Sequence, residues 1–230
     1  NRLLARVVKA VAAAFDDALP RLNREDGVVT GNPIRNEFFE IAGRQVEAGA
    51  RKRLLIFGGS QGSRVLNDAM TAALLFMSRL KDGIEIVHQT GPKELEKVQA
   101  AYRTSAFNDA RVVPYLDPIV DEIAAADLVV SRAGAMTIGE LAAAGRAAVL
   151  IPFAAATNNH QELNARVVER AGGAVVITEA QLTPERLAAT IAEIVNDPQR
   201  ALRMGSAAHG LASREATKMI VDLIERIQRN

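Results

Sequence analysis

The sequence has no cysteine, no tryptophan and only three histidines in 230 residues. Without cysteine it forms no disulfide bond and no thiolate metal site. His88, His160 and His209 lie far apart in the chain, so we expect no histidine-based metal site. His160 lacks a carboxylate at a supporting spacing, and we interpret it as a hydrogen-bonding residue. His88 falls in an apolar run typical of a core strand.

The sequence also has no marked excess of charge of one sign and no long hydrophobic run. The chain has 28 basic and 27 acidic side chains, so its net charge of +1 gives no argument for binding nucleic acid. No apolar run approaches the roughly 20 residues that cross a bilayer, and the basic, amphipathic opening 2–15 lacks the pattern of a signal peptide. We expect a soluble cytoplasmic protein, with contact to a membrane surface left open.

With 49% hydrophobic residues, the chain is long enough for one large or two small globular domains. Short apolar runs alternate with segments of helical periodicity, which predicts a parallel sheet covered on both faces, hence a doubly wound α/β domain. The predicted strands are 54–57, 84–88, 112–115, 128–131, 147–151 and 174–177. Ligands of such folds bind outside the carboxyl ends of the strands.

The two ends of the chain lack this alternation. Apolar spacing predicts one helix over 3–22, and the tight connection 31–35 marks a domain boundary, dividing the chain into 1–33 and 34–230. Three helices are expected at the other end, over 184–196, 198–208 and 212–228. The first two begin at the Thr183-Pro184 and Asp197-Pro198 signals. The last is free to pack on a neighbouring domain.

The segment 127–161 holds the strongest functional pattern. A buried strand ends at Ser131, and a helix starts soon after Gly134, so its unpaired N–H groups suit a diphosphate. Glu140, one turn into that helix, has two acceptor oxygens that suit a vicinal diol such as the ribose 2′,3′-pair. The segment therefore predicts a sugar-nucleotide pocket. The alternative is a plain helix whose Thr137 and Glu140 form half a capping box.

A second glycine-bearing turn follows the first strand at Gly58-Gly59-Ser60-Gln61-Gly62-Ser63, before a helix predicted through 67–80. Its backbone N–H groups and the Ser60 hydroxyl are candidate phosphate donors, although a plain tight turn is equally consistent. Two such turns in one sheet are stronger evidence for a ligand site than either turn alone, because both would open on the same edge of the sheet and could flank one ligand.

Two further segments complete the predicted pocket. Backbone groups of Tyr115-Leu116-Asp117-Pro118 could pair with a flat base edge, or this stretch is an ordinary turn fixed by proline. Asn158, His160, Gln161 and Asn164 start a helix predicted through 171 and suit sugar hydroxyls, because amides both donate and accept. Capping of that helix by Thr157 or Asn158 is the alternative.

Together these residues resemble the MurG family of glycosyltransferases. The matching segments, in order, are 31–35, 58–62, 115–117, 131–140, 151–153 and 160–165. The resemblance implies a GT-B architecture of two Rossmann-like domains, the carboxyl-terminal one holding UDP-N-acetylglucosamine. It implies an inverting transfer of N-acetylglucosamine to a lipid-linked muramyl-pentapeptide, at the inner face of the membrane, in peptidoglycan synthesis, cell shape and cell division.

The resemblance also assigns roles by position. It places Arg35 and Ser60 at the nucleotide-diphosphate, Gln61 in the donor site, Leu116 at the uracil through its backbone, and Ala135, Met136 and Thr137 at the phosphate. Glu140 would hold the ribose, and Gln161, with His160 and Asn164, the sugar hydroxyls. The implied phosphate-loop glycines are Gly58, Gly59, Gly62 and Gly134. No metal or other cofactor is expected.

The family's amino-terminal domain carries the proposed general base and the lipid- and membrane-facing surfaces, and it does not match here. Residues 1–30 resemble only its last helix and strand. We therefore expect no catalytic residue in this chain, binding of the UDP-sugar, and no activity of this half alone. The alternatives are a non-catalytic UDP-sugar-binding subunit of a split transferase and a UDP-sugar transferase acting on another glycolipid.

Overall fold

The computed structural model describes residues 2–43, 51–156 and 159–229. A six-stranded, wholly parallel sheet forms its centre, in the order β5-β4-β3-β6-β7-β8. The strands are β3 Lys52–Phe57, β4 Ile84–Gln89, β5 Arg111–Val113, β6 Leu128–Ser131, β7 Ala148–Leu150 and β8 Ala174–Val176. All six predicted strands and their parallel arrangement are confirmed.

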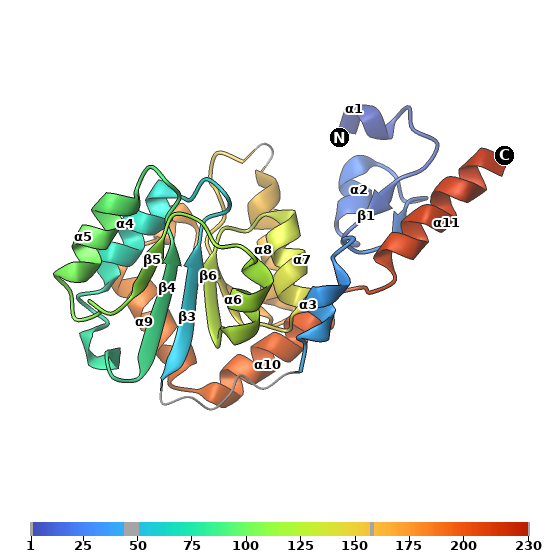
Figure 1. Cartoon of the computed structure of the whole chain (residues 1–230). Helices are drawn as coiled ribbons and strands as arrows, with labels where there is room; N and C mark the ends of the chain where they lie inside the picture. Colours follow the sequence, from blue (N-terminus) through green and yellow to red (C-terminus); the bar gives the residue numbers. More distant parts are fainter. Residues whose placement is uncertain (1, 44–50, 157–158, 230) are drawn as a thin grey trace.

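Helices cover both faces of this sheet (Figure 1). The first group is α3 Asn36–Glu40, α6 Ile119–Ala125, α7 Ala135–Ala143 and α8 His160–Arg170. The second is α4 Arg64–Ala73, α5 Leu95–Arg103 and α9 Pro184–Val195, with α10 Pro198–His209 reaching both. Two single-turn 3₁₀ helices, η1 Ser78–Leu80 and η3 Glu179–Gln181, follow α4 and β8. The helix predicted over 67–80 therefore ends at Ala73, earlier than expected.

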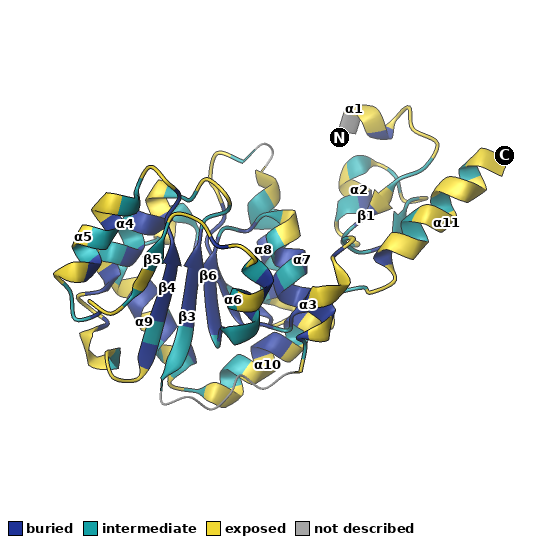
Figure 2. Ribbon diagram, in the orientation of Figure 1, coloured by how far each residue is buried: buried dark blue, intermediate teal, exposed yellow. Residues whose placement is uncertain are grey.

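The core consists of two apolar clusters, one on each face of the sheet. Because side chains alternate along a strand, Leu55 and Phe57 of β3 join the cluster under α6 and α7, whereas Leu54 and Ile56 join the one under α4 and α9. Figure 2 shows β3, β4 and β6 largely buried between the helix layers, whereas the edge strand β5 is partly exposed. This double burial explains why the strands read as continuous apolar runs.

The helix predicted over 3–22 is wrong. The structure instead forms α1 Arg2–Ala5, β1 Ala12–Ala13, α2 Ala18–Leu22 and β2 Val28–Val29, and β1 pairs in parallel with β2. The pairing of Ala12–Ala13 with Val28–Val29 excludes a continuous helix, because extended residues cannot also be helical, and Pro20 lacks the N–H that an interior helical position requires. In α2 it occupies the first turn, where N–H groups have no partner within the helix.

The opening segment 2–33 and the last helix, α11 Ala216–Arg229, extend to the same side of the sheet (Figure 1). They meet at the connection after β2. A Cβ on Gly31, whose φ is +80°, would lie 2.8 Å from the Ser213 Cβ. The boundary at 33/34 remains a prediction, and α3, which follows it, packs on α6 and α7.

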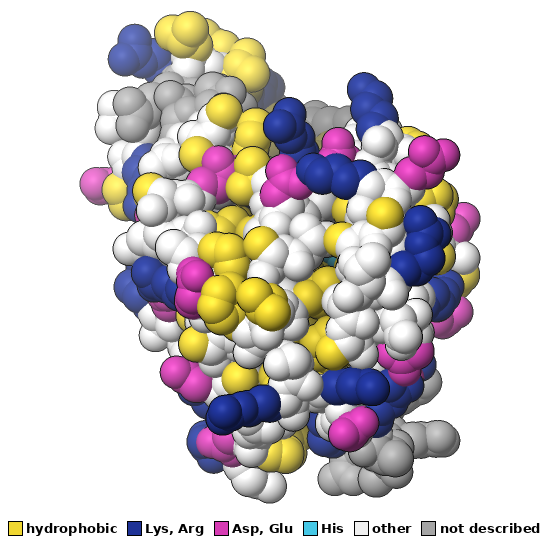
Figure 3. All heavy atoms as spheres, turned by 90° about the vertical axis from the view of Figure 1, so that its left-hand side faces the viewer, with side chains coloured by type: hydrophobic (Ala, Val, Ile, Leu, Met, Phe, Trp, Pro, Cys, Tyr) yellow, Lys and Arg dark blue, Asp and Glu magenta, His cyan; other side chains and the backbone are white. Residues whose placement is uncertain are grey.

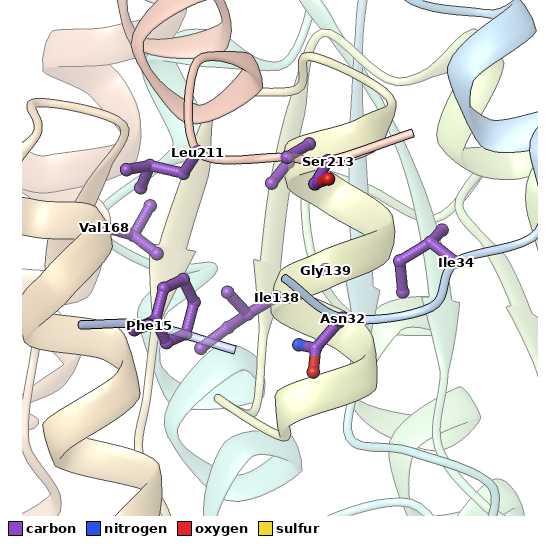
Figure 4. A pocket seen from close by; sticks show the side chains of 10 residues that line it. Phe15, Asn32, Ile34, Ile138, Gly139, Val168, Leu211 and Ser213 are labelled. Atoms are coloured by element: carbon purple, nitrogen blue, oxygen red, sulfur yellow. The ribbon is translucent and has the colours of Figure 1, made fainter. Parts of the chain in front are cut away.

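A small, largely apolar hollow marks the meeting of these segments with α7 (Figure 4). Phe15 from the opening segment, Ile34 from the connection and Leu211 after α10 line it with Ile138 and Val168. Gly139 of α7 allows the close approach, since a Cβ there would lie 2.6 Å from the Ile34 Cδ1. The opening segment is thus seated on the same helix whose start faces the carboxyl edge of the sheet, and the Asn32 amide donates to the carbonyl oxygen of Ala135 in the first turn at 3.0 Å.

Candidate functional site at the carboxyl edge of the sheet

The order of the strands places the topological switch point, outside which doubly wound folds form their ligand-binding crevice, between β3 and β6. The chain leaves β3 toward β4 on one side and β6 toward β7 on the other, and such a switch point is where doubly wound folds bind ligands. Phe57 and Ser131, the last residues of the two strands, are register partners. Both glycine-bearing turns, 58–63 and 132–134, therefore begin side by side at one edge, as the sequence predicted.

The first turn requires its glycines. Gly59 and Gly62 have φ of +89° and +72°, a region that side chains disfavour. A Cβ on Gly62 would lie 1.9 Å from the Thr90 carbonyl oxygen, whereas one on Gly59 would meet nothing within 4 Å. Gly62 thus packs the turn against the loop after β4, and Gly59 faces open space. Ser60 and Gln61 are exposed at the tip.

Helix α4 begins directly after this turn. The Ser63 hydroxyl oxygen, at the N-cap, accepts a hydrogen bond from the Leu66 N–H at 3.4 Å. Beneath it, Asn67 donates to the Thr90 carbonyl oxygen at 2.9 Å, and its own oxygen lies 3.1 Å from the Nε2 of His88. Burial lowers the pKa of His88 to about 3, so the ring is neutral and its Nε2 can donate to Asn67. His88 is thus a core residue, as expected.

The second turn leads into α7. Gly134 is its N-cap residue and provides no side-chain cap, and the first turn contains no acidic residue. The half capping box proposed for Thr137 and Glu140 is therefore not formed. Ala135 and Met136 are exposed and Thr137 is half-buried. The start of α7 presents backbone N–H groups and the positive end of the helix dipole to the crevice.

Glu140 lies half-buried, one turn further along α7. Burial raises the pKa of its carboxyl group, the Arg35 guanidinium lowers it, and Glu37 raises it further. Within the described residues no hydrogen bond or ion pair engages the Glu140 carboxylate. Arg35, at the start of α3, pairs instead with Glu37, Nη1 to Oε1 2.6 Å, and lies over the Phe38 ring. Glu140 is therefore an acceptor without an internal donor at the crevice.

The loop after β7 and the start of α8 form the third wall. The Gln161 Oε1 accepts a hydrogen bond from the Phe153 N–H at 3.0 Å, and within the described residues the Gln161 amide hydrogens have no acceptor. His160 is exposed and Asn164 half-buried on the same helix start. Asn159 is the N-cap residue, without a side-chain cap. Thr157 and Asn158, the alternative caps, lie outside the described residues.

The loop after β5 contributes backbone. Leu116 is buried in the core cluster under α6, so only its main-chain groups can face a ligand, whereas the neighbouring Tyr115 is exposed. From here the chain enters α6, which packs on β3. The arrangement is compatible with the backbone role expected for Leu116.

Sequence reasoning gave no role to Arg132, which the structure places at the centre of this edge. Its guanidinium bonds to Ser63 and to the carbonyl oxygens of Ile151 and Pro152, and it pairs with Glu179. The available signal was a charged residue directly after a fully buried strand, where a long cation needs internal partners.

A doubly wound sheet with two glycine-bearing helix starts at its switch point is typical of nucleotide-binding domains. The chain belongs to glycosyltransferase family 28: residues 53–224 match the model described as the glycosyltransferase family 28 C-terminal domain.

Curated relatives extend the match to the whole chain. The chain is 43% identical over 230 residues to an Anaeromyxobacter sp. (strain K) protein and 40% identical to one from Syntrophotalea carbinolica. Both are named UDP-N-acetylglucosamine–N-acetylmuramyl-(pentapeptide) pyrophosphoryl-undecaprenol N-acetylglucosamine transferase. The chain spans 60% and 62% of their lengths.

Solved structures agree in fold. The crystal structure of Acinetobacter baumannii MurG superposes with a TM-score of 0.79 at 32% identity, over 97% of this chain and 62% of that one. This match confirms the expected GT-B fold class. A Staphylococcus aureus MnaA–UDP co-structure, 13% identical with a TM-score of 0.71, shares the fold alone.

Proposed function

We propose that this chain is the donor-binding half of an inverting transferase that moves N-acetylglucosamine from UDP-N-acetylglucosamine to undecaprenyl-pyrophosphoryl-muramyl-pentapeptide, in peptidoglycan synthesis. The observation that supports this most is the start of α7, uncapped and facing the switch-point crevice, with the half-buried Glu140 one turn behind. A diphosphate fits the helix start, and a ribose diol fits the carboxylate. The names of the relatives indicate the same donor and acceptor.

Each predicted residue has a place in this proposal. Backbone N–H groups of 58–62 and 135–137 bind the diphosphate, with Gly134 at the helix cap and with Ser60, Gln61 and Arg35 at its rim. Glu140 accepts from the ribose hydroxyls, and the Leu116 backbone meets the uracil. Gln161 donates to the sugar hydroxyls through its amide, beside His160 and Asn164.

The proposed reaction forms a bond between an acceptor hydroxyl oxygen and the anomeric carbon while the bond from that carbon to UDP breaks. Configuration inverts, and the acceptor proton passes to a base that this chain does not supply. The start of α7 stabilises the charge that develops on the departing diphosphate, so we propose that no metal ion is required.

A membrane-bound acceptor implies contact with the cytoplasmic face of the membrane. None of the helices in the described parts of the chain is both long and apolar enough to span a bilayer. We propose peripheral association, through surfaces of the complete enzyme, and with it a role in cell shape and division. Nucleic acid is not a proposed partner. On the face shown in Figure 3, acidic and basic side chains are interspersed.

A second candidate, a UDP-sugar-binding subunit of a split transferase, is favoured by one observation. Leu3, Leu4 and Val7 at the start of the chain are exposed, as are Val221 and Ile224 of α11. These side chains offer an apolar surface to a separate subunit or to the remaining part of one enzyme. Restoration of activity by a separate natural subunit would support the split form.

The donor is tested by calorimetric titration of the chain with UDP-N-acetylglucosamine, UDP-galactose, UDP and an ADP-sugar. We expect uridine-dependent binding, and equal affinity for the ADP-sugar would contradict the proposal. The acceptor is tested in the full-length enzyme by comparing lipid-linked muramyl-pentapeptide with diacylglycerol. Turnover with diacylglycerol alone would assign the third alternative, a different glycolipid transferase.

A further inference from the structure

One side chain connects four of the loops at the carboxyl edge. Arg132 follows β6, and its side chain is only 11% exposed. Its Nε donates to the Ser63 hydroxyl oxygen at 2.8 Å, and its Nη1 donates to the carbonyl oxygens of Ile151 at 3.2 Å and Pro152 at 3.3 Å. The loops after β3 and β7 are thereby tied to the loop after β6.

The fourth loop is joined through an ion pair. The Arg132 Nη1 lies 2.6 Å from the Oε1 of Glu179, which belongs to η3 after β8 and is 21% exposed. This buried oxygen has no hydrogen bond among the described residues, so the ion pair with Arg132 offsets the cost of removing the carboxylate from water. A guanidinium can serve several partners at once because its donors are fixed in a planar fork, whereas an ammonium is a compact point charge.

These contacts lead to both halves of the proposed donor site. Ser63 is the N-cap of α4, directly after the glycine turn proposed for the diphosphate. On the other side, the guanidinium lies 5.4 Å from the centre of the Phe153 ring. The Phe153 N–H donates to the Oε1 of Gln161, the residue proposed to read the sugar. Arg132 thus lies between the phosphate loop and the sugar-reading side chain.

We propose that Arg132 is a positioning residue that fixes Gln161 relative to the glycine turn and so determines how strongly the site prefers a UDP-sugar over UDP. The inference rests on the proposed function. It is distinct from a ligand role, because the guanidinium is already engaged by residues of three other loops, those after β3, β7 and β8. Loss of the fork shifts the Phe153 loop, whereas the groups proposed to hold UDP, at 58–62, at the α7 start and at Glu140, remain in place. Ser63, next to the 58–62 turn, is still held as the N-cap of α4 by the hydrogen bond that it accepts from the Leu66 N–H.

The test is Arg132→Lys, which keeps the charge opposite Glu179 but cannot keep all the donor contacts. Calorimetry on the chain would measure Kd for UDP-N-acetylglucosamine and for UDP. We expect the Kd for the UDP-sugar to rise about 10-fold or more, because small misplacements of a binding group are costly. The Kd for UDP should change by less than about 3-fold, which corresponds to about 0.7 kcal/mol.

Arg146→Lys is the matched control. Arg146 is a second buried arginine that donates to backbone carbonyl oxygens, those of Ile123 and Ala124, but at the opposite edge of the sheet. Its replacement should lower the melting temperature and leave the ratio of the two Kd values unchanged. A purely structural role for Arg132 predicts the same outcome for Arg132→Lys.

Glu179→Gln provides a second variant if Arg132→Lys fails to fold, and it should change the Kd ratio in the same direction. An unchanged ratio in a folded Arg132→Lys or Glu179→Gln variant, with normal binding by the wild type, overturns the positioning role alone. A wild-type chain that binds no UDP-sugar overturns the proposed function, and the inference with it.

Discussion

At the amino edge of the six-stranded sheet, charged side chains pair with one another, whereas at the carboxyl edge the Glu140 carboxylate has no ion-pair partner among the described residues. Glu122 pairs with Arg111 and lies 3.9 Å from the Nη1 of Arg53, and Lys52 lies 3.3 Å from Asp127. Asp127 also accepts from the Arg53 N–H at 2.8 Å. These contacts connect the starts of β3 and β6 with β5 and α6.

The carboxyl edge is built differently. Helices α4, α7 and α8 begin there, and within the described residues Glu140 has neither a hydrogen bond nor an ion pair. Because a buried or half-buried polar group without an internal partner costs stability, it marks a place where an external partner is expected. We therefore expect the amino edge to stabilise the fold and the carboxyl edge to bind the ligand.

The largest expected effect is that of Gly62→Ala. The new Cβ would meet the Thr90 carbonyl oxygen, and φ at Gly62 is +72°, so the turn must move. We expect a loss of about 3 kcal/mol in the free energy of unfolding, with donor binding lost as well. Gly59→Ala, with φ of +89° but open space around it, should cost only about 1–2 kcal/mol. Equal losses in urea denaturation would contradict the role of this close contact.

Glu140→Ala and Glu122→Ala compare the two edges directly. Loss of the Glu140 carboxylate should weaken UDP-sugar binding by about 1.5–3 kcal/mol, the range for a hydrogen bond to a charged group, with little change in stability. Loss of Glu122 should lower the free energy of unfolding by about 1–3 kcal/mol and leave the donor affinity unchanged. Calorimetry and denaturation on both variants measure the four values. The reverse pattern would refute the division between the edges.

A smaller effect is expected in the dependence of the free energy of unfolding on pH. Because burial lowers the pKa of His88 to about 3, the native state excludes a proton that the unfolded chain binds below its ordinary value of about 6.5. The free energy of unfolding therefore falls as the pH drops from about 6.5 towards 3, by about 1.4 kcal/mol per pH unit. Above about pH 6.5 this group has no effect on stability. His88→Gln should remove this slope between about pH 6.5 and 5, where most carboxylates stay ionised. A slope equal to that of the wild type would contradict burial of the neutral ring.

Much of the fold could be predicted because its signals are local. Burial on both faces makes each strand a continuous apolar run, and Thr183 and Asp197 cap α9 and α10 by accepting from Arg186 and Arg200 N–H groups. The structure of the opening segment could not be predicted, because its apolar spacing resembles that of a helix. The pairing of 12–13 with 28–29 is a long-range contact that this spacing does not show. Pro20 was the one local sign against that helix.

The candidate site likewise contains residues with a local sequence signal and residues without one. Gly62 and Glu140 could be proposed as site residues from the sequence because glycine turns and helix starts at strand ends have local patterns. Arg132 was missed because its partners, Ser63, Ile151 and Glu179, come from three different loops and meet only in the folded sheet. No spacing rule connects them.

The most direct measurement is calorimetric titration of the wild-type chain and Glu140→Ala with UDP-N-acetylglucosamine, alongside an ADP-sugar. The carboxyl edge, as described, predicts binding by the wild type that depends on uridine and is weakened by about 10-fold or more in the variant. No binding heat with the wild type, or equal affinity for the ADP-sugar, would contradict the assignment of this crevice to the donor.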